Sequence, residues 1–311
     1  MPTCLNCGNE RAENFCPQCG QRAGNRLAIN AFVRDVVDDQ FSADAKIPRT
    51  LVPLFLKPGY LTAEFINGRA ARYIPPFRLY LLASLLFFLL LSFLSNRSDW
   101  AERAERQFQQ QTDSATVLYR AARDSAARAA GTPVDTSRGL NVGVTVGGKP
   151  WLQDAEVNLP WPWLDQKVEA NLQALSKLPP SVAMRRVTDA TIEELPKVMF
   201  LLLPVYALLL KLLYARRNRF YIEHFIFALH LHALTFILFS IALILRAEWT
   251  IIALWVILPV YTFIAMKRVY QQGYIKTFLK WGSLGVVYVT LLCIGLVFAF
   301  IWALAATPTA T

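Results

Sequence analysis

The chain enters a membrane at RTLVPLFLKPGYLTAEFINGRAARYIPPFRLYLLASLLFFLLLSFL, residues 49–94. The first part of this stretch alternates apolar residues with basic ones, whereas the second part, from Pro76 on, is apolar except for Arg78 and two serines. About 20 apolar residues are enough for an α-helix to cross the hydrocarbon core of a bilayer. The stretch therefore predicts a first membrane span at residues 77–95.

The composition of the whole chain agrees with a membrane protein. Of its 311 residues, 55% are hydrophobic and only 17% are charged. A soluble domain of this size would have difficulty burying so much apolar surface. The net charge of +10 is explained by the positive-inside rule, under which Lys and Arg collect in cytoplasmic loops beside membrane spans.

Four more apolar segments predict membrane spans at residues 197–214, 225–245, 249–267 and 282–305. Basic residues concentrate between the second and third spans and between the fourth and fifth, so both connections are expected in the cytoplasm. The first apolar run begins only near Pro76, which indicates that the amino terminus also stays in the cytoplasm. We therefore expect a membrane all-α protein, a five-span helical bundle with its carboxyl terminus outside the cytoplasm.

Residues 96–196, between the first and second spans, predict a mixed extracytoplasmic loop domain. They hold 12 Lys and Arg against 13 Asp and Glu, and long loops of this kind cross the membrane regardless of charge. The spacing predicts a helix from about Asp99 to Ala130 and a strand over Leu140–Val146. Residues 143–149, GVTVGGK, do not form a phosphate-binding loop, because Pro150 replaces the Ser or Thr that would bind Mg²⁺.

Two CxxCG units, Cys4–Gly8 and Cys16–Gly20, predict a metal site within residues 1–25. Two residues between the cysteines let both sulfurs reach one ion, and the following glycine permits a tight turn that points backbone N–H groups at sulfur. Thiols stay reduced in the cytoplasm, so four crowded cysteines favour a metal site over two disulfides. The expected ligands are Cys4, Cys7, Cys16 and Cys19.

This Cys4 site is expected to be structural. Zinc is the expected metal, and iron in a rubredoxin-like centre is the alternative, because cysteine ligands alone do not separate the two. Four protein ligands leave no open coordination position, so the site should stabilise a small zinc ribbon and should not catalyse hydrolysis. A small rigid ribbon of this kind suits contact with another protein.

Residues 26–76 predict cytoplasmic amphipathic and interfacial helices. Apolar residues at helical spacing predict one helix from Leu27 to Phe41. Thr50 is a candidate N-cap of a short helix ending near Leu56, and Thr62 is a candidate N-cap of a second helix that Gly68 ends. Four basic residues form what we call the basic collar: Lys57, Arg69, Arg72 and Arg78. The collar either faces lipid headgroups or only sets the orientation of the chain in the membrane.

The three histidines, His224, His230 and His232, lie in the third span or at its entry and form a candidate intramembrane polar site. On one helix, His230 and His232 point about 160° apart, and His224 lies roughly 12 Å from His232 along the axis. One helix therefore cannot bring all three to one metal. Hydrogen bonds between helices are the favoured role, and a proton or metal path and haem ligation are the alternatives.

No catalytic residues are expected. The chain shows no Ser-His-Asp set on one side of the membrane and no paired carboxylates inside a span, so an enzyme is not the favoured interpretation. Cys293 stands alone in an apolar helix and is expected to be a packing residue. Gly295, Ala299 and Ala303 recur at four-residue spacing and predict a stripe where another helix approaches closely.

Three passages carry a resemblance to a known family: the double CxxCG head ending in FCPQCGQ, residues 49–84, and KVMFLLLPVYALLLKLLY followed by YIEHFIFALHLHALTF. On these passages the chain resembles the DUF3667 family of uncharacterised bacterial membrane proteins with an amino-terminal zinc ribbon. The resemblance covers most of the chain except about residues 98–181. It implies the four cysteines as metal ligands, a bacterial inner membrane, and no known activity.

The favoured function is a non-enzymatic adaptor or scaffold in the inner membrane, whose cytoplasmic zinc ribbon binds a protein partner. The alternative is a transporter or a protein that handles ions or protons with the third-span histidines. The lipid bilayer is an expected partner, and a homo-oligomer stays open. Nucleic acid is not an expected partner, because the cysteine segment has no excess of basic residues and only one aromatic, Phe15.

Overall fold

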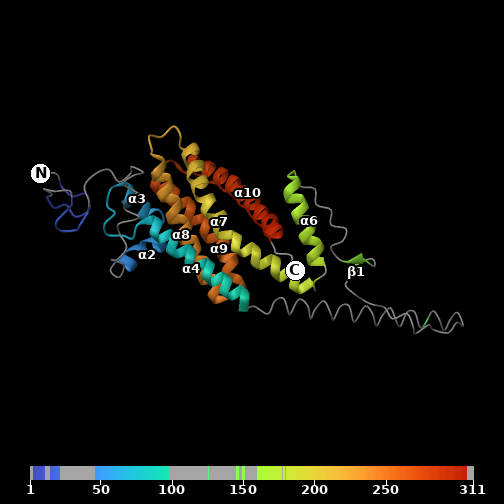
Figure 1. Cartoon of the computed structure of the whole chain (residues 1–311). Coiled ribbons are helices and arrows are strands. Elements are labelled where there is room, and N and C mark those ends of the chain that lie inside the picture. Colours follow the sequence, from blue (N-terminus) through green and yellow to red (C-terminus); the bar gives the residue numbers. More distant parts are fainter. Residues whose placement is uncertain are drawn as a thin grey trace. The chain divides into compact units, whose positions relative to one another are not determined.

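The structure is a computed structural model, and it describes residues 3–10, 15–21, 46–97, 125, 145–146, 149–150, 160–176, 178 and 180–306 (Figure 1). The helices predicted at residues 27–41 and, apart from Ser125, at residues 99–130 lie outside this part of the chain. Only the last two residues of the predicted strand are described, and they form β1.

The described residues form eight helices: α2 (Lys46–Leu56), α3 (Tyr60–Ile66), α4 (Pro76–Arg97), α6 (Pro162–Ser176), α7 (Pro180–Leu213), α8 (Tyr221–Leu245), α9 (Glu248–Tyr270) and α10 (Tyr274–Ala306). Two short strands, β1 (Thr145–Val146) and β2 (Lys149–Pro150), pair in antiparallel register. The helix α7 joins the polar residues after Pro180 to the apolar segment that follows them without a break.

Five of these helices, α4, α7, α8, α9 and α10, are long and apolar enough to cross a membrane. The expected all-α membrane protein with five apolar helices is therefore confirmed, and the chain is a multi-pass membrane protein. The residue limits that the sequence predicts for domains and loops, and the side of the membrane on which each loop lies, stay predictions.

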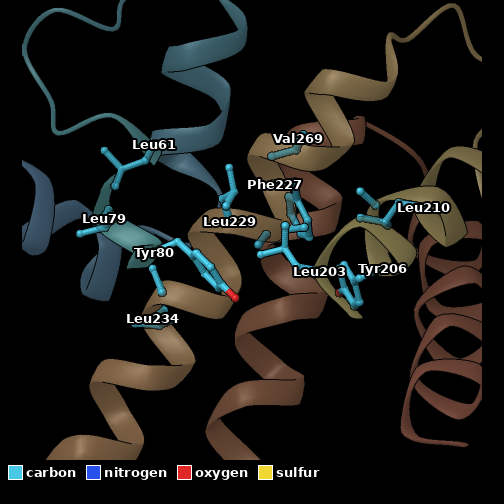
Figure 2. Close-up of a cluster of buried hydrophobic side chains, with 14 of the residues drawn as sticks. Leu61, Leu79, Tyr80, Leu203, Tyr206, Leu210, Phe227, Leu229, Leu234 and Val269 are labelled. Atoms are coloured by element: carbon cyan, nitrogen blue, oxygen red, sulfur yellow. The ribbon is translucent and has the colours of Figure 1, made fainter. Parts of the chain in front are cut away.

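The chain divides into two compact units, the first formed by residues 1–93 and 196–295 and the second by residues 94–195 and 296–311. In the first unit α8 is the central helix. In the most apolar 18-residue stretch of α8, 50% of the residues are buried, whereas 11–28% are buried in the corresponding stretches of the other four spans. Figure 2 shows side chains of α3, α4, α7, α8 and α9 gathered in one core, with Tyr80, Leu203, Phe227 and Leu229 at most 2% exposed.

In the second unit the amphipathic helix α6 carries one apolar face. Leu164, Val168, Leu172 and Leu175 follow helical spacing and pack with residues of α7 and α10. The side chain of Asn171 donates hydrogen bonds to the carbonyl oxygens of Leu304 and Ala305 at 2.8 and 3.0 Å. These are terminal carbonyls of α10 that have no partner within the helix, so Asn171 satisfies them. The mixed loop domain predicted here otherwise stays a prediction.

The helix α2 begins earlier than its predicted N-cap. Thr50 lies inside the helix, fully buried, and its hydroxyl donates to the carbonyl oxygen of Lys46 at 2.7 Å. The hydroxyl oxygen of Thr50 also accepts a hydrogen bond from the backbone N–H of Ile74 at 2.9 Å. The predicted capping role is thus wrong, because Thr50 instead fixes the loop that leads into α4.

The N-cap predicted for α3 is also wrong. The N-cap is Gly59, which has a left-handed backbone (φ 71°), and not Thr62. A Cβ on Gly59 would lie 2.8 Å from the carbonyl oxygen of Ala265 in α9, so only glycine permits this approach. The turn between α2 and α3 therefore packs directly on the backbone of α9.

The small-residue stripe of α10 is confirmed at Gly295, where a Cβ would lie 2.8 Å from the Val198 side chain in α7. The expected packing role of Cys293 is wrong, because its side chain is exposed. Cys293 lies two positions before Gly295 in the helix, so the two residues face directions about 160° apart. Because the stripe at Gly295 faces α7, Cys293 faces away from α7.

Candidate metal centre and its contacts with the membrane helices

The two CxxCG units fold as the same turn. In each unit the backbone N–H of the glycine donates to the carbonyl oxygen of the first cysteine, Gly8 to Cys4 at 2.8 Å and Gly20 to Cys16 at 2.9 Å. Both glycines have positive φ, 80° and 69°, which side chains rarely adopt. The sequence thus folds locally into two equivalent half-sites. We call residues 3–10 and 15–21, which contain both half-sites, the cysteine head.

The four sulfurs of the cysteine head form one cluster. The Sγ atoms of Cys4 and Cys19 lie 3.6 Å apart, and those of Cys7 and Cys16 lie 3.4 Å apart. All four lie within 4.8 Å of one another. These separations are too long for disulfides, whose sulfurs lie about 2.05 Å apart. They approach the edge of about 3.8 Å that follows for a tetrahedron of sulfurs around an ion at 2.3 Å.

The environment of the thiols favours thiolates held by a cation. The backbone N–H of Cys19 holds the pKa of the Cys16 thiol below its usual value. The backbone N–H of Asn9 acts to lower the pKa of Cys7, but burial and the neighbouring thiols raise it to about 12. Four clustered thiols therefore do not all ionise by themselves, and a bound cation would offset their mutual repulsion. The four cysteines fit a metal ion with no open coordination position.

The cysteine head contacts the loop between α3 and α4 at two hydrogen bonds. The side-chain nitrogen of Gln21 donates to the carbonyl oxygen of Gly68 at 2.6 Å. The guanidinium of Arg72 donates to the carbonyl oxygen of Asn6 at 2.7 Å. A side chain at Gly68, whose φ is 79°, would also meet Leu5, since its Cβ would lie 2.9 Å from the Leu5 methyl carbon. One loop thus carries both cysteine half-sites.

The basic collar makes contacts within the chain. Arg69 forms a two-pronged ion pair with Glu64, with Nε donating to Oε2 at 2.8 Å and Nη2 donating to Oε1. This hydrogen bond to Glu64 raises the pKa of Arg69. Lys57 lies 5.3 Å from the centre of the Tyr60 ring, and Arg78 lies in the first turn of α4. Two of the four collar residues, Arg69 and Arg72, therefore organise the loop under the cysteine head, and contact with lipid headgroups stays a prediction.

The three histidines of α8 contact three different helices. His224 Nδ1 lies 2.8 Å from the hydroxyl of Tyr270 in α9, and His230 Nδ1 lies 3.1 Å from the hydroxyl of Thr62 in α3. His232 Nε2 lies 2.7 Å from the hydroxyl of Tyr288 in α10. Within the described residues, the cysteine cluster is the only group of three or more potential metal ligands. The histidines thus do not form a shared metal site there.

The contacts of His232 define its tautomer. Nδ1 lies 2.8 Å from the carbonyl oxygen of Ala228, which only accepts hydrogen bonds. Nδ1 therefore carries the proton, and Nε2 accepts from Tyr288. Both ring nitrogens have partners, so His232 links α8 to α10. For His224 and His230, Nε2 is buried without a hydrogen-bond partner in the described part of the chain.

The sequence did not identify the partners of the histidines, among them Thr62 and Tyr270. Thr62 was predicted to cap a helix, and Tyr270 lies beyond residue 267, the predicted end of its span. Their histidine partners are 168 and 46 residues away. No local pattern could reveal these pairs.

Residues 44–88 match the family model described as "Protein of unknown function (DUF3667)". The match supports the family resemblance over these residues, which contain α2, α3 and the loop that contacts the cysteine head. No curated protein and no solved structure matches the chain.

Proposed function

We propose that the chain is a non-enzymatic adaptor of the bacterial inner membrane, in which a zinc-loaded cysteine head on the cytoplasmic side binds a protein partner. The zinc stabilises the head, and the five spans anchor it. A closed set of four cysteines favours this role over catalysis, because no coordination position is left for a substrate.

The observation that carries this proposal is the attachment of the cysteine head to the membrane helices. The head rests on the loop of Gly68 and Arg72, and that loop continues through the Arg69–Glu64 pair into α3. Helix α3 is joined to the central helix α8 by the contact between Thr62 and His230. The head also exposes 56% of Phe15, a large apolar side chain. A partner that covers such a side chain would gain hydrophobic burial on a support that is held in place.

The transport alternative keeps one supporting observation. The Nε2 atoms of His224 and His230 are buried without a partner in the described residues, and buried polar groups of this kind mark some ion pathways. Against it, each of the three histidines bonds to a different helix, as structural residues do.

Metal analysis and partner capture with the full-length chain test the proposal. The wild type should carry about one zinc, and Cys7→Ser together with Cys19→Ser should lose both zinc and the co-purifying partner. Cys293→Ser is the matched control, because this thiol is exposed on α10 and distant in sequence from the head. A partner that stays bound to the zinc-free variant would refute the adaptor.

Proteoliposome flux tests the alternative. A substrate or ion flux that falls when His230 becomes Ala, while His232→Ala retains it, would favour transport, because of these two histidines only His230 has a ring nitrogen without a partner among the described residues. Absent flux, or flux that ignores both changes, argues for the adaptor.

A further inference from the structure

A cavity of about 550 Å³ lies where α9 ends and α10 begins. Its volume falls in the range of about 300–1,000 Å³ that is typical of ligand sites. Its walls include Phe263, Ile264, Lys267, Arg268, Gln272 and Tyr274. None of these residues belongs to the cysteine head or to the histidine contacts.

The wall of the cavity changes from apolar to cationic along α9. Phe263 and Ile264 belong to the apolar segment of the span, and Lys267 and Arg268 follow one turn later in its last turn. An amphiphile with apolar chains and an anionic head matches this order, because its chains would lie along the apolar turn and its head beside the basic one.

The positive charge of the cavity is not neutralised by the described residues. Residues 249–311 contain no Asp or Glu. Lys267 lies 3.7 Å from the centre of the Tyr274 ring, and Arg268 donates one hydrogen bond to the carbonyl oxygen of Pro58 at 2.9 Å. These contacts are with uncharged groups. They hold both cations in place and leave most of their N–H donors available to an anion.

Gln272 adds a hydrogen-bonding group to the same cavity. Its side-chain oxygen Oε1 is buried and has no partner in the described part of the chain. An unpaired buried amide oxygen is costly, and a hydroxyl of a ligand can satisfy it. The cavity therefore combines two cations for a phosphate with an acceptor for a hydroxyl.

We propose that this cavity binds the headgroup of an anionic phospholipid that carries hydroxyl groups, of the phosphatidylglycerol type. Lys267 and Arg268 bind the phosphate, Gln272 accepts a headgroup hydroxyl, and the acyl chains run along Phe263 and Ile264. The proposal does not depend on the adaptor function, since it involves neither the metal nor a protein partner.

Binding of short-chain phosphatidylglycerol to the full-length chain in neutral detergent tests this proposal. Phosphatidylcholine of the same chain length should bind far more weakly, and free glycerol phosphate should not compete at equal concentration. Lys267→Gln should weaken binding about fivefold, because one basic residue near an anionic lipid contributes about 1 kcal/mol. Lys267→Arg should bind like the wild type.

Lys276→Gln is the matched control, because it removes the same charge from an exposed position in α10 that does not line the cavity. Equal loss from Lys267→Gln and Lys276→Gln would show a general electrostatic attraction and would overturn the site. Competition by glycerol phosphate at equal concentration would assign the cavity to a soluble phosphate and overturn the lipid. A Lys267→Arg variant that elutes as the wild type does but fails to bind would also overturn it.

Discussion

Replacing Gly59 with alanine should separate the turn between α2 and α3 from helix α9. Gly59 has a φ of 71°, and its Cβ would lie 2.8 Å from the Ala265 carbonyl oxygen and 3.0 Å from the Ala265 Cα. Both neighbours are backbone atoms of a membrane helix, so they cannot turn aside as a flexible side chain would.

Two costs combine at this position. A residue with a Cβ in the left-handed region costs about 1–2 kcal/mol. Forcing a methyl group into a packed contact costs about 1–3 kcal/mol. The free energy of unfolding should therefore fall by about 2–5 kcal/mol, unless α3 moves away from α9 and carries its loop with it.

Unfolding of the purified chain in mixed micelles, followed by tryptophan fluorescence as denaturing detergent is added, measures this change. Gly285→Ala is the matched control, because it lies within α10 with nothing within 4 Å of the new Cβ. It should be neutral or stabilising by up to about 1 kcal/mol, since alanine is the better helix former. If Gly59→Ala stays within about 0.5 kcal/mol of the wild type, the packing argument is refuted.

Three further predictions concern the metal, the ion pair and one histidine. Removing the metal with a chelator should unfold the cysteine head. Limited proteolysis should then cut within the first 21 residues while the spans stay protected. Cleavage that does not change on metal removal would contradict a head stabilised by metal. Arg69→Gln should destabilise the chain by about 1–3 kcal/mol, because it leaves the Glu64 carboxylate nearly buried without its cation. The additional change Glu64→Gln should recover part of this loss, and no recovery would contradict the pairing. His232→Ala and Tyr288→Phe should couple by about 1 kcal/mol in a double-mutant cycle of unfolding, whereas simple additivity would show that the hydrogen bond adds no stability.

The parts of the candidate site that could be predicted are those that a short segment specifies. The spacing of Cys4 and Cys7 and of Cys16 and Cys19, each followed by glycine, is a local property, and the structure brings all four sulfurs together. The predicted N-caps failed because the same threonine hydroxyl can bond locally or across the fold. Thr50 lies inside its helix and bonds both to Lys46 and to the distant Ile74, and Thr62 contacts the distant His230.

The sequence by itself determined the five apolar helices and the cysteine cluster, because hydrophobic length and ligand spacing act over about 20 residues or fewer. Only the tertiary structure decided what these parts contact. It placed the cysteine head on the loop of Gly68 and Arg72, joined each histidine to a different helix, and formed the basic cavity at the end of α9. The physical reason is that hydrogen bonds and packing between residues far apart in the chain depend on how the helices are arranged, which no local pattern records.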